Sequence, residues 1–462
     1  MARNAAVKFD YDLIVIGSGA AGSTAAFAAA KQKLKVALVE ASLFGGESPN
    51  WGDVPTKALL HAAQLYDEAI QGTRFGIRSS MLSYNFPSLQ QWRAKAVRRT
   101  GAADNRRHYT SAGIDTFAGN AHFLSPHEIS VNRKHLTARN FLIATGTSFD
   151  KPSTYGIDTV RYHTPQTILE RNRLPRSLFI VGADSTGMEM AQLFATFGTK
   201  VYIAEKAARL LPNEDPEVGD LMEKHFTQSK GIVCLTQTQV AGLEKKGLGM
   251  RVSYTRGNAS KSVQVDEILF TGNRIPATDL GLENAKVNYT PAGIEVNDNL
   301  RTSARHIYAA GSVIGGDSVA THTAMLQARV AVGNIISPRK NLRTGDTSAT
   351  PRVTYTSPGI ASLGLSENDC IRRDLSVRQA AAPLSLIARS NTSDYTTGFV
   401  KLIADYKGVL LGATVVAPHA AEISHELALA LHMGMTAADI AELPHAFLSW
   451  SEAVRSAAAR LV

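Results

Sequence analysis

Cysteine is nearly absent from this chain of 462 residues, in which only Cys234 and Cys370 occur, far apart. This excludes a disulfide-stabilised secreted scaffold and a zinc module built on cysteines. Long hydrophobic runs are also missing, because glycines interrupt the apolar stretch over residues 11–30. That stretch is typical of a strand followed by a helix, and not of a membrane span or a signal peptide. We therefore expect a soluble cytoplasmic protein without a membrane partner.

Length and composition indicate a folded chain of several domains. Hydrophobic residues make up 44% and charged residues 19% of the sequence, which excludes a disordered or fibrous chain. The length is about three times that of a usual domain, so two or three domains are expected. The net charge of +9 comes from scattered basic residues. It suits an anionic nucleotide ligand and gives no reason to expect nucleic acid.

The first 40 residues contain a complete dinucleotide-binding pattern. An apolar strand over 11–16 is followed by a glycine motif, a helical stretch over 22–33 and a second strand over 35–40. The motif residues are Gly17, Gly19 and Gly22, and the second strand ends at Glu40. These glycines permit a tight turn, a close approach of a pyrophosphate and close packing of helix on strand. The pattern predicts phosphates at the helix N-terminus and an adenosine ribose hydrogen-bonded to Glu40.

A second copy of this pattern is altered. Strands over 177–182 and 200–205 flank a helix over 187–197, and Gly182, Gly187 and Glu205 are retained. Asp184 occupies the position of the middle glycine. At an effective dielectric constant near 20, two unit charges ~5 Å apart repel by roughly 3 kcal/mol, so a carboxylate here opposes a pyrophosphate. Two interpretations stay open: a weakened nicotinamide dinucleotide site, or a relic domain kept for packing.

The rest of the chain completes the predicted architecture. Strands that end on small-residue turns are expected over 141–146, 267–272 and 307–311, and a helix is expected over 321–334. Beyond these, residues 352–416 are rich in strand patterns and residues 420–460 are helical. The fold class is α/β, with two doubly wound dinucleotide-binding domains and a C-terminal α+β domain.

The segment over residues 45–60 resembles the active-site segment of the flavoprotein pyridine nucleotide-disulfide oxidoreductases, the family of dihydrolipoamide dehydrogenase, glutathione reductase and mercuric reductase. Further matches at 307–311, 354–365 and 398–402 extend the resemblance over nearly the whole chain. The resemblance implies FAD in a split first domain, NAD(P)H in a second and homodimerisation through a third. The implied boundaries are 1–150 with 275–336, 151–274 and 350–462.

The resemblance also implies site residues. For FAD these are Gly17, Gly19, Gly22, Glu40, Gly46, Lys57, Ala121, Thr145, Gly146, Gly311 and Ser312, and for the pyridine nucleotide Gly182, Gly187, Glu205 and Gly272. No metal is implied. Lys57 and Glu189 match a catalytic ion pair whose ammonium lies near flavin N5, although such a pair can also be retained for folding alone. Ser312 stands where the family has an aspartate that bonds the ribityl chain, so weaker FAD retention is expected.

Three departures from the family pattern bear on function. Ser48 and Asp53 occupy the positions of the two redox cysteines, and neither side chain can cycle between thiol and disulfide. Phe447 occupies the position of the acid–base histidine. His445, two residues away, is either a substitute or an ordinary packed or exposed histidine. Disulfide reduction is therefore not expected.

These features favour an FAD-dependent NAD(P)H oxidoreductase without disulfide chemistry, with a quinone, dye, oxygen or second pyridine nucleotide as electron acceptor. An FAD-binding pseudoenzyme with little turnover is the alternative, and an active disulfide or metal-ion reductase is disfavoured. Glu205 favours NADH over NADPH because an acid at the ribose opposes a 2′-phosphate. Lys206 and Arg209 nearby leave that preference open.

Overall fold

The computed structural model describes residues 8–78, 81–272, 274–316, 320–337 and 342–462. The chain forms two compact units, which are described separately. The first comprises residues 1–56, 91–150 and 273–347, and the second comprises 57–90, 151–272 and 348–462.

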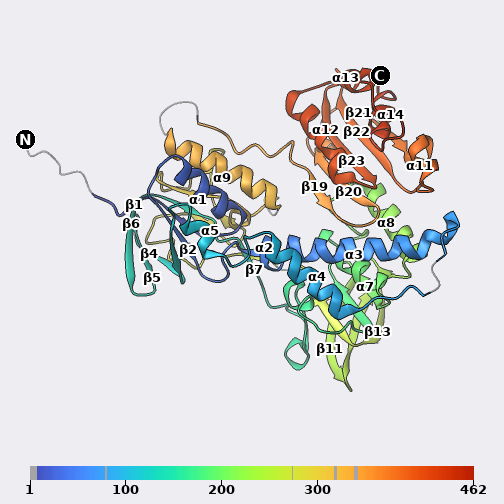
Figure 1. The fold of residues 1–462 in the computed structure, drawn as a ribbon, viewed down its shortest axis with the longest axis horizontal. Coiled ribbons are helices and arrows are strands. Elements are labelled where there is room, and N and C mark those ends of the chain that lie inside the picture. The colour runs from blue at the N-terminus through green and yellow to red at the C-terminus, as the bar shows by residue number, and fades with distance from the viewer. Residues whose placement is uncertain (1–7, 79–80, 273, 317–319, 338–341) are drawn as a thin grey trace, which may run out of the picture. The chain divides into compact units, whose positions relative to one another are not determined.

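The first unit is built on a sheet of order β3-β2-β1-β6-β5-β4, with β18 beside β6. Strand β1 (Tyr11–Ile16) pairs in parallel with β2 (Val36–Glu40) and β6 (Lys134–Ile143). Apart from Asp12, its residues are buried and largely apolar, as expected of a parallel strand covered on both faces. Helices α1 (Ala20–Lys31) and α9 (Thr321–Ile336), far apart in sequence, lie side by side (Figure 1).

Shorter elements complete this unit. Its further helices are α2 (Glu47–Asn50), α5 (Arg106–Thr110) and the 3-10 turn η3 (Ser312–Ile314). Its further strands are β3 (Asp115–Ala118), β4 (Ala121–Ser125), β5 (Glu128–Val131), β7 (Thr147–Phe149), β15 (Arg274–Pro276), β16 (Tyr289–Thr290), β17 (Gly293–Ile294) and β18 (Ile307–Ala309). Helices α3 (Asp53–Gln71) and α4 (Phe86–Arg99) belong partly to each unit.

The second unit contains a four-stranded parallel sheet of order β10-β9-β8-β14. It repeats the strand–helix–strand design, with β8 (Ser177–Val181), α7 (Ser185–Thr196) and β9 (Lys200–Ala204). The sheet is completed by β10 (Val233–Leu235) and β14 (Glu267–Phe270), and the unit adds η1 (Gly72–Phe75), η2 (Ile157–Thr159), α6 (Pro165–Ile168) and α8 (Pro216–Ser229). A separate antiparallel sheet contains β11 (Thr238–Lys246), β12 (Gly249–Arg256) and β13 (Ala259–Val265).

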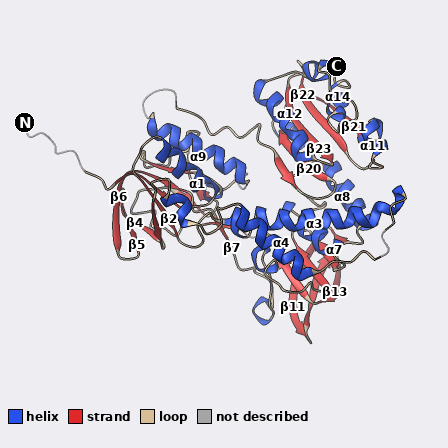
Figure 2. Ribbon diagram, viewed as in Figure 1, coloured by secondary structure: helices blue, strands red, loops and turns tan. Residues whose placement is uncertain are grey.

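The C-terminal part of the second unit is an antiparallel sheet of order β19-β20-β23-β22-β21. Its strands are β19 (Arg352–Thr354), β20 (Gly359–Gly364), β21 (Val377–Pro383), β22 (Phe399–Asp405) and β23 (Leu410–Ala417). Its helices are α10 (Glu367–Arg372), η4 (Leu384–Leu386), α11 (Ala388–Thr392), α12 (Ala420–Met433), α13 (Ala437–Glu442) and α14 (Glu452–Ala458). Helix α12 packs on β20 and β23, and α14 packs on β21 and β22 (Figure 2).

The structure confirms the α/β fold class and shifts two predicted helix starts. Helix α1 begins at Ala20 and α7 at Ser185, so Gly22 and Gly187 lie inside the first turn of their helices. Residues before each of these glycines can already be helical, because the N–H groups in the first turn of a helix need no partner within the helix. Within the described residues, no helix has both the length and the hydrophobicity that a membrane span requires.

Candidate dinucleotide sites and the redox segment

The first glycine loop has the geometry of a phosphate cradle. Gly17 has a φ of +96°, and a Cβ atom there would lie 2.3 Å from the carbonyl oxygen of Ala144. At Gly22 a Cβ atom would lie 1.8 Å from the carbonyl oxygen of Gly17, so only glycine fits at either position. Gly19, the N-cap residue of α1, borders open space, and no described side chain caps the helix there. These N–H groups and this space fit a dinucleotide pyrophosphate.

Glu40 is fixed at the end of β2 beside this loop. Its Oε2 accepts hydrogen bonds from the backbone N of Ser18 at 2.8 Å and from Ser18 Oγ at 2.7 Å, and its Oε1 accepts one from Ser42 N at 2.8 Å. The backbone N of Gly119 donates to the Glu40 carbonyl, which brings the start of β4 at Ala121 toward this end of the sheet. The carboxylate is thus held in place where the sequence predicts a ribose partner.

Other predicted FAD residues gather around the same loop. A Cβ atom on Gly46 would lie 2.5 Å from the Cα of Gly19, and one on Gly17 would lie 3.0 Å from the Cα of Thr145. A Cβ atom on Gly311 would lie 3.4 Å from Ala21, which places the end of β18 against the first turn of α1. Gly146 (φ +71°) directly follows Thr145, and Ser312 directly follows Gly311 at the start of η3.

Ser48 and Asp53, which the family resemblance aligns with the two redox cysteines, are joined by a hydrogen bond. Ser48 Oγ donates to Asp53 Oδ2 at 2.8 Å, and Thr321 Oγ1 donates to the same oxygen at 2.6 Å. Asp53 begins α3 and Thr321 begins α9, so two helix N-termini favour the negative charge. Thr321 was missed from the sequence, because nothing local to a threonine at a helix start indicates a carboxylate 268 positions away.

The predicted pair of Lys57 and Glu189 forms an ion pair within the second unit. Lys57 Nζ lies 2.8 Å from Glu189 Oε2, and the side chains are 30% and 3% exposed. Glu189 Oε1 accepts a hydrogen bond from Tyr355 N at 2.9 Å, and the Lys57 ammonium lies 5.0 Å from the centre of the Tyr355 ring. Tyr355 is a further member of this cluster that sequence reasoning missed.

The second glycine loop repeats the first with one change. A Cβ atom on Gly187 would lie 2.0 Å from the Gly182 carbonyl oxygen, and Glu205 Oε2 accepts a hydrogen bond from Ala183 N at 2.9 Å. A Cβ atom on Gly182 would lie 3.7 Å from Gly272 N, so the predicted turn at Gly272 also lies beside this loop. Asp184, however, is the N-cap of α7, and its Oδ1 accepts a hydrogen bond from Gly187 N at 2.8 Å.

The two cradles therefore differ in their fit to a dinucleotide. The second retains the carboxylate for a ribose but places the Asp184 carboxylate at the helix N-terminus. A negative side chain there satisfies an N–H group and opposes a phosphate.

The segment in which the sequence predicts Phe447 in place of an acid–base histidine also contains His445, whose side chain is packed. Phe447 is 76% exposed. The His445 side chain is only 4% exposed, with Nε2 at 3.2 Å from Glu426 Oε2 and Nδ1 at 2.9 Å from the Leu443 carbonyl oxygen. Of the two sequence-based alternatives for His445, the packed side chain agrees with this geometry.

The two cysteines lie outside these sites. Burial raises the pKa of the Cys234 thiol to about 11, and burial followed by the charge of Asp369 raises that of Cys370. Both thiols are buried and free. Neither Cys234 nor Cys370 is therefore expected to react as a thiolate at neutral pH. The described residues contain no cluster of three or more potential metal ligands.

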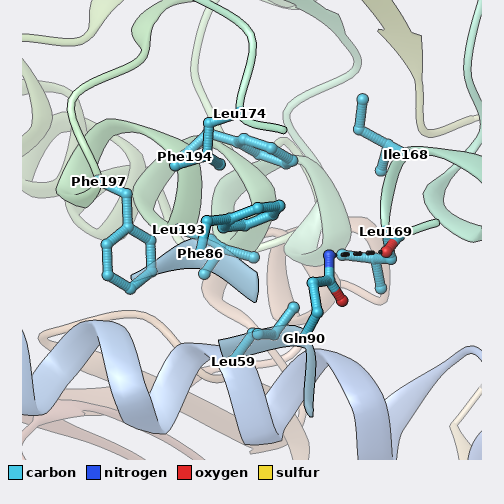
Figure 3. Close-up of a pocket in the computed structure, with 9 residues that line it drawn as sticks. All are labelled: Leu59, Phe86, Gln90, Ile168, Leu169, Leu174, Leu193, Phe194 and Phe197. Atoms are coloured by element: carbon cyan, nitrogen blue, oxygen red, sulfur yellow. Dashed lines mark hydrogen bonds between the residues drawn. The ribbon is translucent and has the colours of Figure 1, made fainter. Parts of the chain in front are cut away.

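An apolar cavity of about 10 Å³ lies in the second unit (Figure 3). It is lined by Leu59, Phe86, Gln90, Ile168, Leu169, Leu174, Leu193, Phe194 and Phe197. Gln90 Nε2 donates to the carbonyl oxygens of Leu169 and Arg171, at 3.1 and 3.0 Å. The space is of the order that one water molecule needs, so the cavity does not hold a substrate.

Comparisons with known proteins agree with this architecture. Residues 11–333 match the pyridine nucleotide-disulphide oxidoreductase family, and residues 350–458 match the dimerisation domain of that family. Mercuric reductase of Bacillus cereus is 32% identical over 456 residues, which cover 97% of this chain and 71% of that protein. Dihydrolipoyl dehydrogenase of Thermus scotoductus is 33% identical over 457 residues, 98% of this chain and 97% of the relative.

A solved structure shares the fold over nearly the full length. The HOCl-induced flavoprotein disulfide reductase of Escherichia coli, in its Cu(II) complex, has a TM-score of 0.84 and 25% sequence identity. The match covers 98% of this chain and 99% of that chain.

Proposed function

Since the chain belongs to the pyridine nucleotide-disulphide oxidoreductase family, whose members are FAD-dependent oxidoreductases that use NAD(P)H, we propose that it oxidises NAD(P)H without disulfide chemistry. The observation that carries the proposal is the hydrogen bond between Ser48 and Asp53, which occupies the place of a redox disulfide. The electrons pass to a small-molecule acceptor instead of a disulfide substrate. The protein acts as a homodimer through the domain matched at residues 350–458.

The residues of the first unit support FAD binding. The N–H groups at the start of α1 and the open space at Gly19 receive the pyrophosphate, and Glu40 receives the adenosine ribose. FAD, when bound, supplies the capacity to accept a hydride and to release its electrons again. The role of Lys57 and Glu189 beside the flavin rests on the family resemblance together with their intact ion pair.

One observation favours a second candidate, an FAD-binding pseudoenzyme. Asp184 caps the helix at which a pyridine dinucleotide would place its phosphates. If this carboxylate prevents NAD(P)H binding, the first cradle still holds FAD but no hydride reaches it.

Anaerobic mixing of the purified, FAD-loaded protein with NADH distinguishes the oxidoreductase from the pseudoenzyme. We expect the long-wavelength flavin absorption to bleach and to return when an acceptor is added. An absorption that stays unchanged at millimolar NADH contradicts the oxidoreductase and favours the pseudoenzyme.

A substrate panel tests the absence of disulfide chemistry. We expect no reduction of lipoamide, glutathione disulfide or Hg(II) above the rate of free flavin, because both cysteines are buried and protonated. Turnover that survives replacement of Cys234 and Cys370 would overturn the assignment of Ser48 and Asp53.

A further inference from the structure

The C-terminal end of α4 and the start of α5 gather positive charge on the first unit. Residues 91–114 contain six lysine and arginine residues but only one carboxylate, that of Asp104. Four of these basic residues are exposed and belong to no ion pair within the described residues. These four, which we call the basic surface, are Lys95, Arg98, Arg99 and Arg107. Their charges are therefore available to a partner outside the chain.

The backbone brings the members of the basic surface together. Lys95, Arg98 and Arg99 are spaced i, i+3 and i+4 along α4, so they share one face of that helix. Asn105, the N-cap residue of α5, donates through Nδ2 to the carbonyl oxygen of Gly101 at 2.6 Å. Because Gly101 follows α4 by only two residues, this hydrogen bond turns the start of α5, with Arg107, back toward the last turn of α4.

Neighbouring residues fix this part of the chain beside the first cradle. The backbone N of Asp104 donates to the Phe44 carbonyl oxygen at 2.7 Å, and Asp104 Oδ1 accepts a hydrogen bond from Phe44 N at 3.2 Å. Arg106 Nη2 donates to the carbonyl oxygen of Thr116 in β3 at 2.8 Å. Phe44 comes two residues before Gly46, which packs against the glycine loop. The basic surface is therefore held at the border of the first cradle.

Helix stability accounts for only part of this charge. Arg98 and Arg99 stand in the last turn of α4, where cations interact favourably with the helix dipole. Lys95 and Arg107 lie outside that turn. Like charges gathered on one small surface repel one another. An anionic partner relieves this repulsion, which no ion pair within the described residues does.

The surroundings of the basic surface favour an acidic protein as that partner. Between residues 85 and 123, all of which are described, no large hydrophobic side chain is exposed. Attachment to a membrane surface uses apolar side chains beside the cations, and single-stranded nucleic acid stacks its bases on exposed aromatic rings. The Trp92 ring lies under the Arg99 guanidinium, with 5.9 Å between ring centre and Cζ. Arginine pairs with a carboxylate through two parallel hydrogen bonds, and three of the four members are arginine.

We propose that the basic surface docks the acidic face of a partner protein. This docking goes beyond the oxidoreductase function and is independent of it. Electrostatic attraction steers a face rich in aspartate and glutamate toward the four cations, and exposed ion pairs then hold it weakly and in a salt-dependent way. The docked partner lies at the border of the first cradle.

Binding of an acidic polypeptide to the purified full chain tests the proposal. The probe is fluorescein-labelled poly-L-glutamate, and its anisotropy is measured at low ionic strength. One fourfold variant carries Lys95→Gln, Arg98→Gln, Arg99→Gln and Arg107→Gln. Four exposed ion pairs of ordinary strength together amount to about a tenfold rise in Kd. The salt dependence of Kd should also become weaker.

A matched control separates the location of the charge from its amount. Four exposed cations spread over the same unit are replaced by Lys31→Gln, Arg133→Gln, Lys286→Gln and Arg305→Gln. This control lowers the net charge of the protein as much as the first variant does. Its Kd for poly-L-glutamate should stay within about twofold of the parent value, because no replaced residue belongs to the basic surface.

Two further probes distinguish the classes of partner. Single-stranded oligothymidylate and vesicles that contain phosphatidylglycerol are titrated in parallel, and the fourfold variant should change their binding less than that of poly-L-glutamate. A larger change for either probe would assign the surface to nucleic acid or lipid and overturn the acidic protein. Equal Kd values in the variant and its control, or a parent that does not bind poly-L-glutamate, would overturn the docking surface itself.

Circular dichroism and the thermal midpoint verify that each variant is folded. If the fourfold variant does not fold, the single charge reversals Arg107→Glu and Arg305→Glu give the same comparison. We expect only Arg107→Glu to weaken the binding of poly-L-glutamate, and equal effects of the two reversals would contradict the proposal.

Discussion

Gly19 and Asp184 occupy equivalent positions in the two glycine loops, and the difference between them bears directly on phosphate binding. Each is the N-cap of the helix after the first strand of its unit. The hydrogen bond between the loop and the following strand is the same in both units. Glu40 accepts it from Ser18 N, and Glu205 accepts it from Ala183 N. The side chain at the helix N-terminus therefore decides whether a phosphate can approach.

We predict that Asp184→Gly strengthens NADH binding. The change removes a like charge and opens the helix N-terminus, and exchanging an acidic cap for glycine costs the fold only a few tenths of a kcal/mol. Affinity should rise about tenfold, equal to ~1.4 kcal/mol, as measured by titration of the purified protein. Flavin reduction at low NADH should quicken in step, with little change in its maximum rate.

Asp184→Asn is the matched variant for that experiment, because asparagine retains the cap and removes only the charge. We expect part of the gain, and that part should shrink at high salt. If neither variant binds NADH detectably, the second cradle is inactive for another reason and the pseudoenzyme becomes the leading assignment.

Asp53 should also lower the tendency of bound FAD to take up electrons. Removal of a nearby negative charge favours a reduced, more negative flavin, so Asp53→Asn is expected to raise the midpoint potential. NADH affinity should stay the same, since Asp53 lies in the first unit and Asp184 in the second. Spectroelectrochemical titration measures the potential, and a lower or unchanged value would count against this role.

At the scale of elements, Lys401 of β22 joins α8 and α10. The residue is 3% exposed, and its Nζ lies 2.8 Å from Glu367, 3.0 Å from Glu217 and 3.5 Å from Asp215. Burial lowers the pKa of Lys401, but hydrogen bonds to Glu367 and Glu217 outweigh burial and raise it overall. Removal of the lysine would therefore leave the buried Asp215 and the partly exposed Glu217 and Glu367 without their cation.

We predict that Lys401→Met lowers the free energy of unfolding by about 3 kcal/mol, the lower end for a broken buried ion pair because Glu217 and Glu367 are partly exposed. Urea denaturation measures the difference. Lys407→Met removes an exposed lysine after the same strand and should have little effect. Equal losses in the two variants would contradict the buried network.

The same cluster predicts a difference in acid sensitivity. The hydrogen bond from Lys401 is the largest cause that lowers the pKa of Glu367, followed by that from Gln379. A lowered carboxyl pKa contributes stability above its unfolded value, and this stability is lost as pH falls through the folded value. From about pH 5 downward, the parent should therefore lose stability more steeply than Lys401→Met. If the free energy of unfolding fell equally steeply with pH in both proteins, the Lys401–Glu367 interaction would be excluded as the cause.

The sequence predicted elements that depend on local pattern. The strand, glycine loop and helix of each dinucleotide unit were identified because the apolar runs and glycine spacing are local. The Lys401 cluster and the Thr321 contact were not, because their partners are brought together from distant parts of the chain. The sequence predicts Asp184 as an obstacle to a pyrophosphate. Its hydrogen bond from Gly187 N, which caps the helix, depends on the backbone conformation and is seen only in the structure.

At the scale of the whole molecule, the C-terminal domain carries several large apolar side chains that are exposed in the single chain. Phe447 is 76% exposed, Met433 67% and Leu429 61%. Such residues in a domain that matches a dimerisation family favour burial against a second copy. We predict a homodimer by light scattering at micromolar concentration. Phe447→Asp should shift it toward monomer, and a monomeric parent would contradict the prediction.

FAD should stabilise the molecule as a whole. Ligand that binds only the folded state raises the unfolding midpoint with concentration, and at 100 times Kd the gain is about 2.7 kcal/mol. We expect added FAD to raise the thermal midpoint and to colour the protein yellow. Gly19→Asp copies the second cradle into the first and should remove most of that shift.

The Ser48–Asp53 hydrogen bond also determines how many electrons the protein can store. A redox disulfide and a flavin each take up two electrons, so a member with both can hold four. If Ser48 and Asp53 replace the redox cysteines, the flavin remains as the store, since Cys234 and Cys370 are both buried and free. Reductive titration should therefore end after one two-electron equivalent per FAD, without the band of a thiolate beside the flavin. We therefore expect the protein to carry one electron pair at a time and to release that pair before it accepts another.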